Sequence, residues 1–177
     1  MGCSSLDSPK GSLFLISPDA FGNQPLLRPI SLETLAFPAG LALSPNEKFI
    51  YVAEMLQNRV LRYFESPDGV YKASVFFQFS GGVGPVALDV DSSGNLYVAH
   101  FDVKESSADG RVSIISAAGK LMETLVTPGA EISGICVRCS TLSHHIHLIV
   151  IKCICCRDNK IFITERSNGM VMKITKQ

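Results

Sequence analysis

The sequence has no excess of either charge and no run of basic residues. Its 16 Lys and Arg residues balance 16 Asp and Glu residues, which leaves a formal net charge of zero. A protein that binds nucleic acid typically gathers Lys and Arg into a basic patch or stripe. We therefore expect no nucleic-acid partner, and we expect no membrane partner either.

Helical periodicity and a secretory signal are also missing. No stretch repeats apolar residues at i, i+3, i+4 and i+7 over several turns, so we expect almost no helix. The start of the chain shows no charged segment followed by an apolar stretch and a small-residue cleavage site. Met1-Gly2 would open a myristoylation signal, but Leu6 stands where Ser or Thr is required. These observations favour a cytoplasmic location.

Two common catalytic motifs are absent as well. The sequence contains no Gly-x-Ser-x-Gly nucleophile turn. The glycine-rich stretch 81–84 lacks the Lys-Ser/Thr pair of a phosphate-binding loop, and no helical pattern follows it. We interpret this stretch as a tight connection between two sheets.

What the sequence does contain is a repeat. One copy reads FPAGLALSPNEKFIYVAEMLQNRVLRY from Phe37, and a second reads GPVALDVDSSGNLYVAHFDVKESSADGRVSI from Gly84. A third starts as ISGICV at Ile132 and resumes as KIFITERSNGMVMKI at Lys160. Anchor residues in the three copies are spaced 47 residues apart: Gly40, Ala87 and Gly134. This period suits one small antiparallel sheet per repeat, as in the blades of a β-propeller.

Each copy alternates short β-rich segments with turn residues. Segments such as Phe49-Ile50-Tyr51-Val52 are rich in β-branched and aromatic residues, and clusters such as Ser44-Pro45-Asn46-Glu47 separate them. We predict an all-β chain, residues 1–177, that forms a single partial propeller domain of about three to three and a half blades. The blade sheets are expected at Gly40 to Phe79, Ala87 to Val126 and Gly134 to Ile174, after a partial blade at Ser12 to Leu35.

The motifs FPAGLALSPNEKFIYVAE, NRVLRY, GVYKASVFFQFSGGVGP, GNLYVAHF and IFITERSNGMVMKI carry a family resemblance. The chain resembles the senescence marker protein, gluconolactonase and luciferin-regenerating-enzyme superfamily and its strictosidine-synthase-like neighbours. The resemblance implies a six-bladed propeller, a small-molecule substrate and hydrolysis of a lactone or ester. It also implies that this chain is a partial copy, because its start is similar to the middle of a family member. We expect self-association through the open propeller edges.

The resemblance also indicates where a ligand would bind. In such propellers the site lies where the first strand of each blade begins and the second strand ends. The ends of the second strands place three candidate general bases, Glu54, His100 and Glu165, at one repeated blade position. Three further polar residues near the channel are candidates for substrate binding: Asn58, Glu131 and Ser133. The alternative interpretation is that polar residues stand at these strand ends only because the ends meet water.

No metal or other cofactor is expected. Related metal-dependent lactonases carry oxygen-donor side chains at the starts of the first strands, where they bind a divalent cation such as calcium or zinc. Here two of these places hold Ala39 and Val86, which offer no oxygen ligand, and Ser133 is a poor ligand on its own. Three functions stay open: a lactone or ester hydrolase, a non-catalytic propeller scaffold or fragment, and a metal-independent strictosidine-synthase-like pocket with Glu54 or Glu165 as base.

The third repeat is interrupted by RCSTLSHHIHLIVIKCICC, residues 138–156. Five of the six cysteines and three of the four histidines lie between Cys136 and Cys156. Thiolate and imidazole groups are zinc ligands, but these spacings match no standard zinc module. We interpret the segment as a non-native or lineage-specific insertion into a blade.

Overall fold

The computed structural model describes residues 4–17, 26–102, 109–137, 160–166 and 170–175, and all regular structure in these ranges is β-strand. No helix that could cross a membrane occurs among these residues. The strands are β1 (Gly11–Ser17), β2 (Leu26–Leu35), β3 (Pro38–Leu43), β4 (Phe49–Glu54), β5 (Arg59–Glu65), β6 (Tyr71–Gln78), β7 (Gly84–Val90), β8 (Leu96–Phe101), β9 (Asp109–Ile115), β10 (Leu121–Pro128), β11 (Ile132–Val137), β12 (Lys160–Glu165) and β13 (Met170–Thr175).

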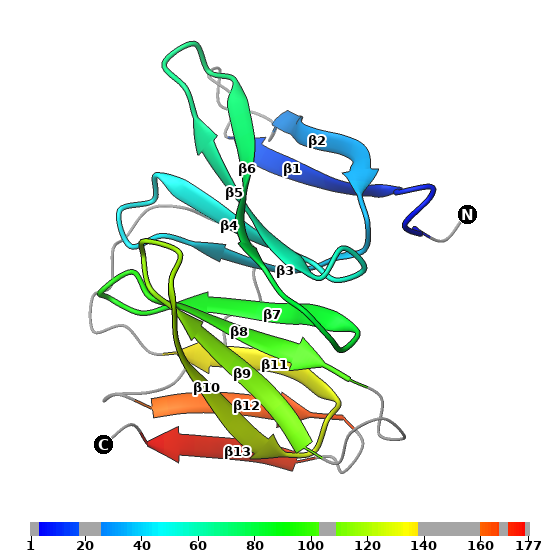
Figure 1. Ribbon diagram of the computed structural model, residues 1–177. Helices are drawn as coiled ribbons and strands as arrows, with labels where there is room; N and C mark the ends of the chain where they lie inside the picture. Colours follow the sequence, from blue (N-terminus) through cyan, green and yellow to red (C-terminus); the bar gives the residue numbers. More distant parts are fainter. Residues whose placement is uncertain (1–3, 18–25, 103–108, 138–159, 167–169, 176–177) are drawn as a thin grey trace.

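The strands form four antiparallel sheets, each made of strands that follow one another in the chain. Their orders are β1-β2, β3-β4-β5-β6, β7-β8-β9-β10 and β11-β12-β13. The sheets are stacked in sequence order, with the hairpin β1-β2 at one end and β11-β13 at the other (Figure 1). This architecture confirms the prediction of an all-β partial propeller, and the sheet limits lie within a few residues of the expected blades.

Turn residues define the sheets locally, as the sequence pattern predicts. The Asp91 carboxylate accepts hydrogen bonds from the backbone N–H groups of Ser93 (3.0 Å) and Asn95 (2.8 Å), which closes the β7-β8 turn. At the matching place between β3 and β4, Ser44 donates to the Asn46 side chain at 2.7 Å. The two repeats therefore use different polar side chains to make the same reversal.

The core lies between successive sheets rather than inside any one of them. One apolar cluster joins β3-β6 to β7-β10 and includes Val60 and Val98, both fully buried. A second cluster joins β7-β10 to β11-β13 through Val112 and Ile163. The sheets come close together at Gly40, where a Cβ atom would lie 2.8 Å from the Val86 carbonyl oxygen. Glycine at this anchor position allows β3 to pack directly against β7.

Residues 138–156, the predicted insertion, lie outside the described residues, so the domain interpretation stays a prediction. The strands on either side of the segment pair directly, with Val137 opposite Ile161. The corresponding pairs are Leu43 with Ile50 in the first repeat and Val90 with Leu96 in the second. The third blade therefore keeps the pairing of the other two on both sides of the segment.

Candidate functional site

The three blades share one register where the first strand begins and the second strand ends. The paired residues at this place are Pro38 with Glu54, Pro85 with His100, and Ile132 with Glu165. The sequence-based alignment of the three candidate bases therefore corresponds to one ladder position in the fold. We call this end of the blades the mouth.

A β-bulge follows that pair in every blade. The register shifts between Pro38 and Gly40, between Pro85 and Ala87, and between Ile132 and Gly134. The residues skipped by the ladder are the three expected ligand positions of a cation site: Ala39, Val86 and Ser133. A bulge re-aims the side chain of its extra residue and often lies beside a functional site. Because β7 contacts both β3 and β11, the three bulges lie on neighbouring strands.

Glu54 is buried at the mouth and both of its carboxylate oxygens are engaged. Its side chain is 1% exposed. Oε1 accepts a hydrogen bond from the Ala36 N–H at 2.7 Å, and Oε2 forms an ion pair with Arg59 Nε at 2.6 Å. These contacts tie the β2-β3 connection and the start of β5 to the end of β4, which suits a positioning role.

His100 is also buried, with a residue exposure of 3%. Its Nε2 lies 3.0 Å from Ser113 Oγ and its Nδ1 lies 3.4 Å from Arg111 Nη2. Because a guanidinium can only donate, Nδ1 is the acceptor and Nε2 carries the proton. Burial, and then the charge of Arg111, lower the pKa of His100 from 6.5 to about 3. His100 is therefore a neutral imidazole at neutral pH.

Arg59 and Arg111 occupy equivalent places, and the sequence analysis did not single them out. Arg59 pairs with Glu54 on the β4-β5 ladder, as Arg111 pairs with His100 on the β8-β9 ladder. The signal was present in the repeat, because the first two copies have Arg-Val near the start of the third strand, as Arg59-Val60 and Arg111-Val112. Arg59 is neutralised by a carboxylate, whereas Arg111 faces a neutral ring and forms no salt bridge with any described residue.

Asn58 lies at the turn between β4 and β5 with a φ of 52°. Its Nδ2 donates to the Gly81 carbonyl at 2.8 Å, which connects this turn to the glycine-rich link between β6 and β7. Its Oδ1 is buried and has no hydrogen-bond partner among the described residues. The free acceptor is compatible with a hydrogen-bonding role toward a ligand.

Glu131 and Ser133 belong to the third blade. The Glu131 backbone bridges to Phe101 at the end of β8, and its carbonyl accepts from the Arg166 N–H at 2.9 Å. Within the described part of the chain, the Glu131 carboxylate makes no hydrogen bond or ion pair. Ser133 Oγ lies 3.1 Å from Thr164 Oγ1 and 3.3 Å from the Thr164 carbonyl. The side chain of Glu165, the third candidate base, lies outside the described part of the structure.

The described residues at the mouth do not fit a divalent cation. The side chains at two of the three bulges, Ala39 and Val86, are hydrocarbon, and the Ser133 hydroxyl is hydrogen-bonded to Thr164. Among the described residues, no three His, Cys, Asp or Glu side chains are grouped so that they could hold a metal ion. The expectation that the chain uses no metal is a prediction about solution behaviour, which titration can test.

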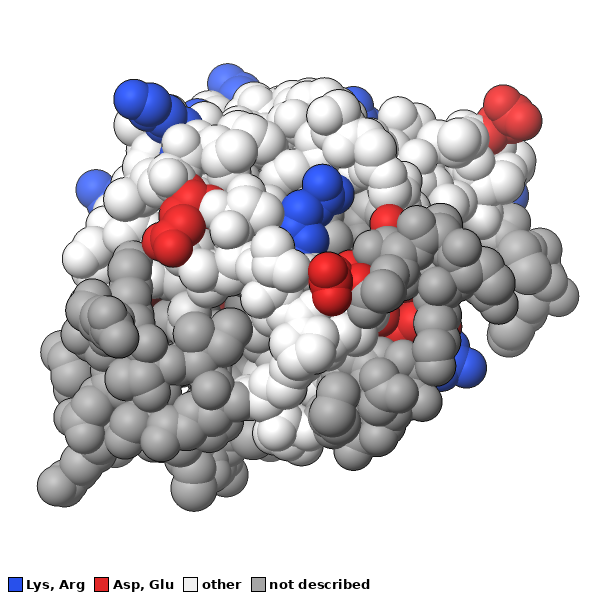
Figure 2. All heavy atoms as spheres, turned by 60° about the horizontal axis from the view of Figure 1, so that its bottom comes forward, with Lys and Arg blue, Asp and Glu red and all other residues white. Residues whose placement is uncertain are grey.

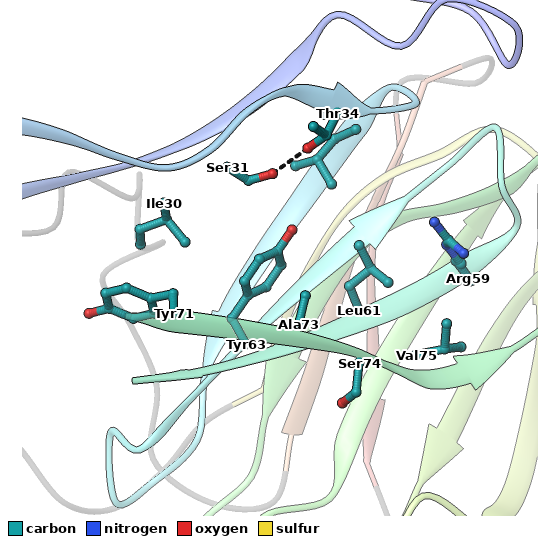
Figure 3. Close-up of a pocket in the computed structure, with 11 residues that line it drawn as sticks. Ile30, Ser31, Thr34, Arg59, Leu61, Tyr63, Tyr71, Ala73, Ser74 and Val75 are labelled. Atoms are coloured by element: carbon teal, nitrogen blue, oxygen red, sulfur yellow. Dashed lines mark hydrogen bonds between the residues drawn. The ribbon is translucent and has the colours of Figure 1, made fainter. Parts of the chain in front are cut away.

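Two cavities lie between the hairpin and the β3-β6 sheet. One of about 370 Å³ has Tyr63 and Arg59 on its wall, below Ser31 and Thr34 of β2, which are hydrogen-bonded to each other (Figure 3). Burial raises the pKa of the Tyr63 hydroxyl, so this wall is uncharged there. Neither cavity contains any of the six predicted site residues. A propeller channel needs walls from every blade of the ring, and the described strands supply only part of them.

Charge on the face drawn in Figure 2 is scattered. Lys or Arg side chains and Asp or Glu side chains are interspersed among neutral surface (Figure 2). No strong field of one sign covers this face of the described residues.

Comparison with known proteins supports the same architecture. A lactonase drp35 of Staphylococcus haemolyticus is 32% identical over 128 residues, covering 70% of this chain and 36% of the relative. The corresponding lactonase of Staphylococcus aureus strain USA300 is 31% identical over the same length. The chain thus spans about a third of the length of the curated relatives it matches.

Solved structures show the likeness in three dimensions. A luciferin-regenerating enzyme superposes with a TM-score of 0.67 at 18% identity, covering 98% of this chain and 56% of that one. A gluconolactonase from Xanthomonas campestris gives a TM-score of 0.58 at 21% identity, covering 87% and 41% respectively. The family model described as SMP-30/gluconolactonase/LRE-like region matches residues 1–143. The chain therefore belongs to the SMP-30/gluconolactonase/LRE-like family.

Proposed function

We propose that this chain forms part of a propeller that hydrolyses a small lactone or related ester at its mouth. The observation that carries the proposal is the shared register of three blades, which repeats polar groups at one end of the strands in a member of this family. The lactonase relatives support the substrate class by their names. We also infer a small-molecule substrate, a cytoplasmic location, and no nucleic-acid or membrane partner, in keeping with the balanced charge.

Arg111 is the group proposed to stabilise negative charge. When water attacks the acyl carbon, the carbonyl electron pair moves to oxygen, and the oxyanion requires a nearby cation or hydrogen-bond donors. The guanidinium of Arg111 can supply both, because it forms no ion pair with a described carboxylate. His100 is the proposed positioning residue, since its Nδ1 accepts a hydrogen bond from Arg111 and burial keeps the ring neutral.

Glu131 is the proposed general base. Its carboxylate, unlike that of Glu54, makes no hydrogen bond or ion pair with any described residue, so it is available to accept a proton from water. The tetrahedral intermediate then collapses, the bond between the acyl carbon and the leaving oxygen breaks, and the alkoxide takes up that proton. The products are a hydroxyl group and a carboxylic acid, which ionises at neutral pH. Glu54 is less well suited to act as the base, because Arg59 and Ala36 occupy both of its carboxylate oxygens.

The test is steady-state hydrolysis of a sugar δ-lactone and of a simple aryl ester by the purified chain, with and without a chelator. We expect Glu131→Gln and Arg111→Gln each to lower kcat by about 100-fold or more. Glu123→Gln, at an exposed acidic residue on β10, is the matched control and should leave kcat unchanged. Unchanged kcat in both mouth variants would overturn these assignments, and chelator-sensitive hydrolysis would overturn a metal-independent reaction.

A non-catalytic scaffold is the second candidate, and a specific observation favours it. The buried groups Glu54 and His100 are both held by structural contacts, so neither is free to exchange protons with a substrate. A scaffold predicts that the wild-type chain hydrolyses neither substrate above the uncatalysed rate. The strictosidine-synthase-like alternative predicts no hydrolysis but saturable binding of a small amine or aldehyde that Glu165→Gln weakens.

A further inference from the structure

We propose that the larger cavity between the hairpin β1-β2 and the β3-β6 sheet, of about 560 Å³, binds a neutral, apolar small molecule. None of the six predicted site residues lines this cavity, so it would be a site separate from theirs. Its volume lies within the range of about 300 to 1,000 Å³ that is typical of small-molecule sites. The inference does not depend on the proposed hydrolysis.

Aliphatic side chains from the hairpin and from the sheet form two facing walls of the cavity. The hairpin contributes Leu13, Leu15 and Ile30, and the sheet contributes Leu41, Leu43 and Ile50. Four of the six pack against the buried apolar cluster between the hairpin and the sheet. All six are nevertheless only partly buried. A ligand in the cavity would cover more of their apolar surface, and the free energy gained is roughly proportional to the area removed from water.

The charged groups around the cavity balance one another, which favours an uncharged ligand. On one side Arg28 and Glu65 form an ion pair at 3.2 Å, and the Arg28 guanidinium lies over the Tyr71 ring. Elsewhere on the wall the exposed turn residues Glu47 and Lys48 carry one charge of each sign. An ion that entered would lose hydration without gaining the attraction of a net opposite charge. A neutral molecule loses nothing of this kind.

Hydrogen-bonding groups are few on the cavity walls. Apart from Glu47, Lys48 and Glu65, the polar side chain among the described lining residues is that of Tyr71. Burial raises the pKa of the Tyr71 hydroxyl, which keeps this group neutral. Hydrocarbon walls offer water few partners, whereas an apolar molecule needs none. The cavity therefore suits a hydrocarbon framework of rings or branched chains, such as a terpenoid or a fused aromatic compound.

The test is a fluorescence titration of the intact 177-residue chain with N-phenyl-1-naphthylamine, a neutral dye that brightens in apolar surroundings. We expect saturable binding of one dye per chain, with a dissociation constant on the order of 10 μM. The related anionic dye 8-anilino-1-naphthalenesulfonate should bind about tenfold more weakly or less, because its sulfonate would lose hydration. Equal or tighter binding of the anionic dye would overturn the preference for a neutral ligand.

Two neighbouring residues of β1 provide a matched pair of variants. Leu15 lines the cavity, whereas Ile16 points to the other face of the hairpin and is 48% exposed. Leu15→Trp would fill part of the cavity and should raise the dissociation constant of the neutral dye by about tenfold or more. Ile16→Trp adds the same ring on the outer face and should leave the constant unchanged.

Circular dichroism must show the wild-type strand spectrum for each variant. If Leu15→Trp fails to fold, Leu15→Gln replaces it, because an amide in a hydrocarbon wall disfavours an apolar ligand without added bulk. A wild-type chain that does not bind the neutral dye would overturn the proposal. So would unchanged binding in the Leu15 variant, or an equal loss in the Leu15 and Ile16 variants.

Discussion

Arg59 Nε lies 2.6 Å from Glu54 Oε2 across the β4-β5 ladder, and the Glu54 side chain is almost completely buried. The same carboxylate accepts the Ala36 N–H, so one side chain connects three segments of the chain. Removing a buried carboxylate that has two strong contacts destabilises the fold mainly because its former partners are left unpaired. The loss would leave an unpaired guanidinium and an unpaired amide.

The first prediction follows from that ion pair. Glu54→Ala should lower the free energy of unfolding by about 3 kcal/mol, because Arg59 and the Ala36 N–H both lose their partner. Glu54→Gln should cost less, since the amide oxygen can still accept from Ala36. The control is Glu65→Ala, whose ion pair with Arg28 is about half exposed and should be worth less than about 1 kcal/mol. If Glu54→Ala and Glu65→Ala lower the free energy of unfolding equally in urea titrations, the buried ion pair stabilises the fold no more than the exposed one.

The second prediction concerns pH. His100 binds a proton in the folded state only near pH 3, whereas an unfolded histidine does so near its ordinary value of 6.5. Between these values the unfolded chain binds more protons, so the free energy of unfolding should fall as pH is lowered from 7 to 4. The slope assignable to His100 is at most about 1.4 kcal/mol per pH unit. His100→Gln should flatten this dependence, and a variant with the wild-type slope would show that another group is responsible.

The third prediction is that the chain does not bind calcium or zinc at the mouth. Ala39 and Val86 place methyl groups where a hard cation requires oxygen, so a bound ion would lack ligands and remain in water. Titration calorimetry with calcium should give only the heat of dilution. Micromolar calcium binding that disappears on substitution of Glu54 or Glu165 would contradict this prediction.

The fourth prediction is that residues 138–156 can be removed with a gain in solubility. The extra loop length itself costs little, because closing a loop costs only about 0.6 kcal/mol for each doubling of its length. The larger penalty is expected from the apolar run Leu148-Ile149-Val150-Ile151, which can pair with other chains. Joining Val137 to Arg157 should therefore raise the soluble yield and sharpen the thermal transition. Unfolding of the deleted chain, or clear stabilisation of the intact chain by zinc, would identify the segment as a structural element.

The repeat explains why so much of the fold could be predicted from the sequence. The limits of the blades depend on strands and turns that are close in the chain, such as the Asp91 to Asn95 turn. Each copy of the repeat shows the same strand-turn pattern, so the limits can be predicted from several copies independently. The equivalence of Glu54, His100 and Glu165 could be predicted for the same reason.

The partners of those residues could not be predicted in this way. Whether Glu54 meets Arg59 or solvent depends on burial against the next blade, and the state of His100 depends on Ser113 and Arg111, which lie on another strand. The bulges at Ala39, Val86 and Ser133 are likewise a property of strand pairing. The sequence by itself determined the family, the blades and the repeated mouth position, because these depend on local pattern. Only the tertiary structure decided which side chains at the mouth are engaged in hydrogen bonds or ion pairs, because pairing and desolvation arise when distant segments pack together.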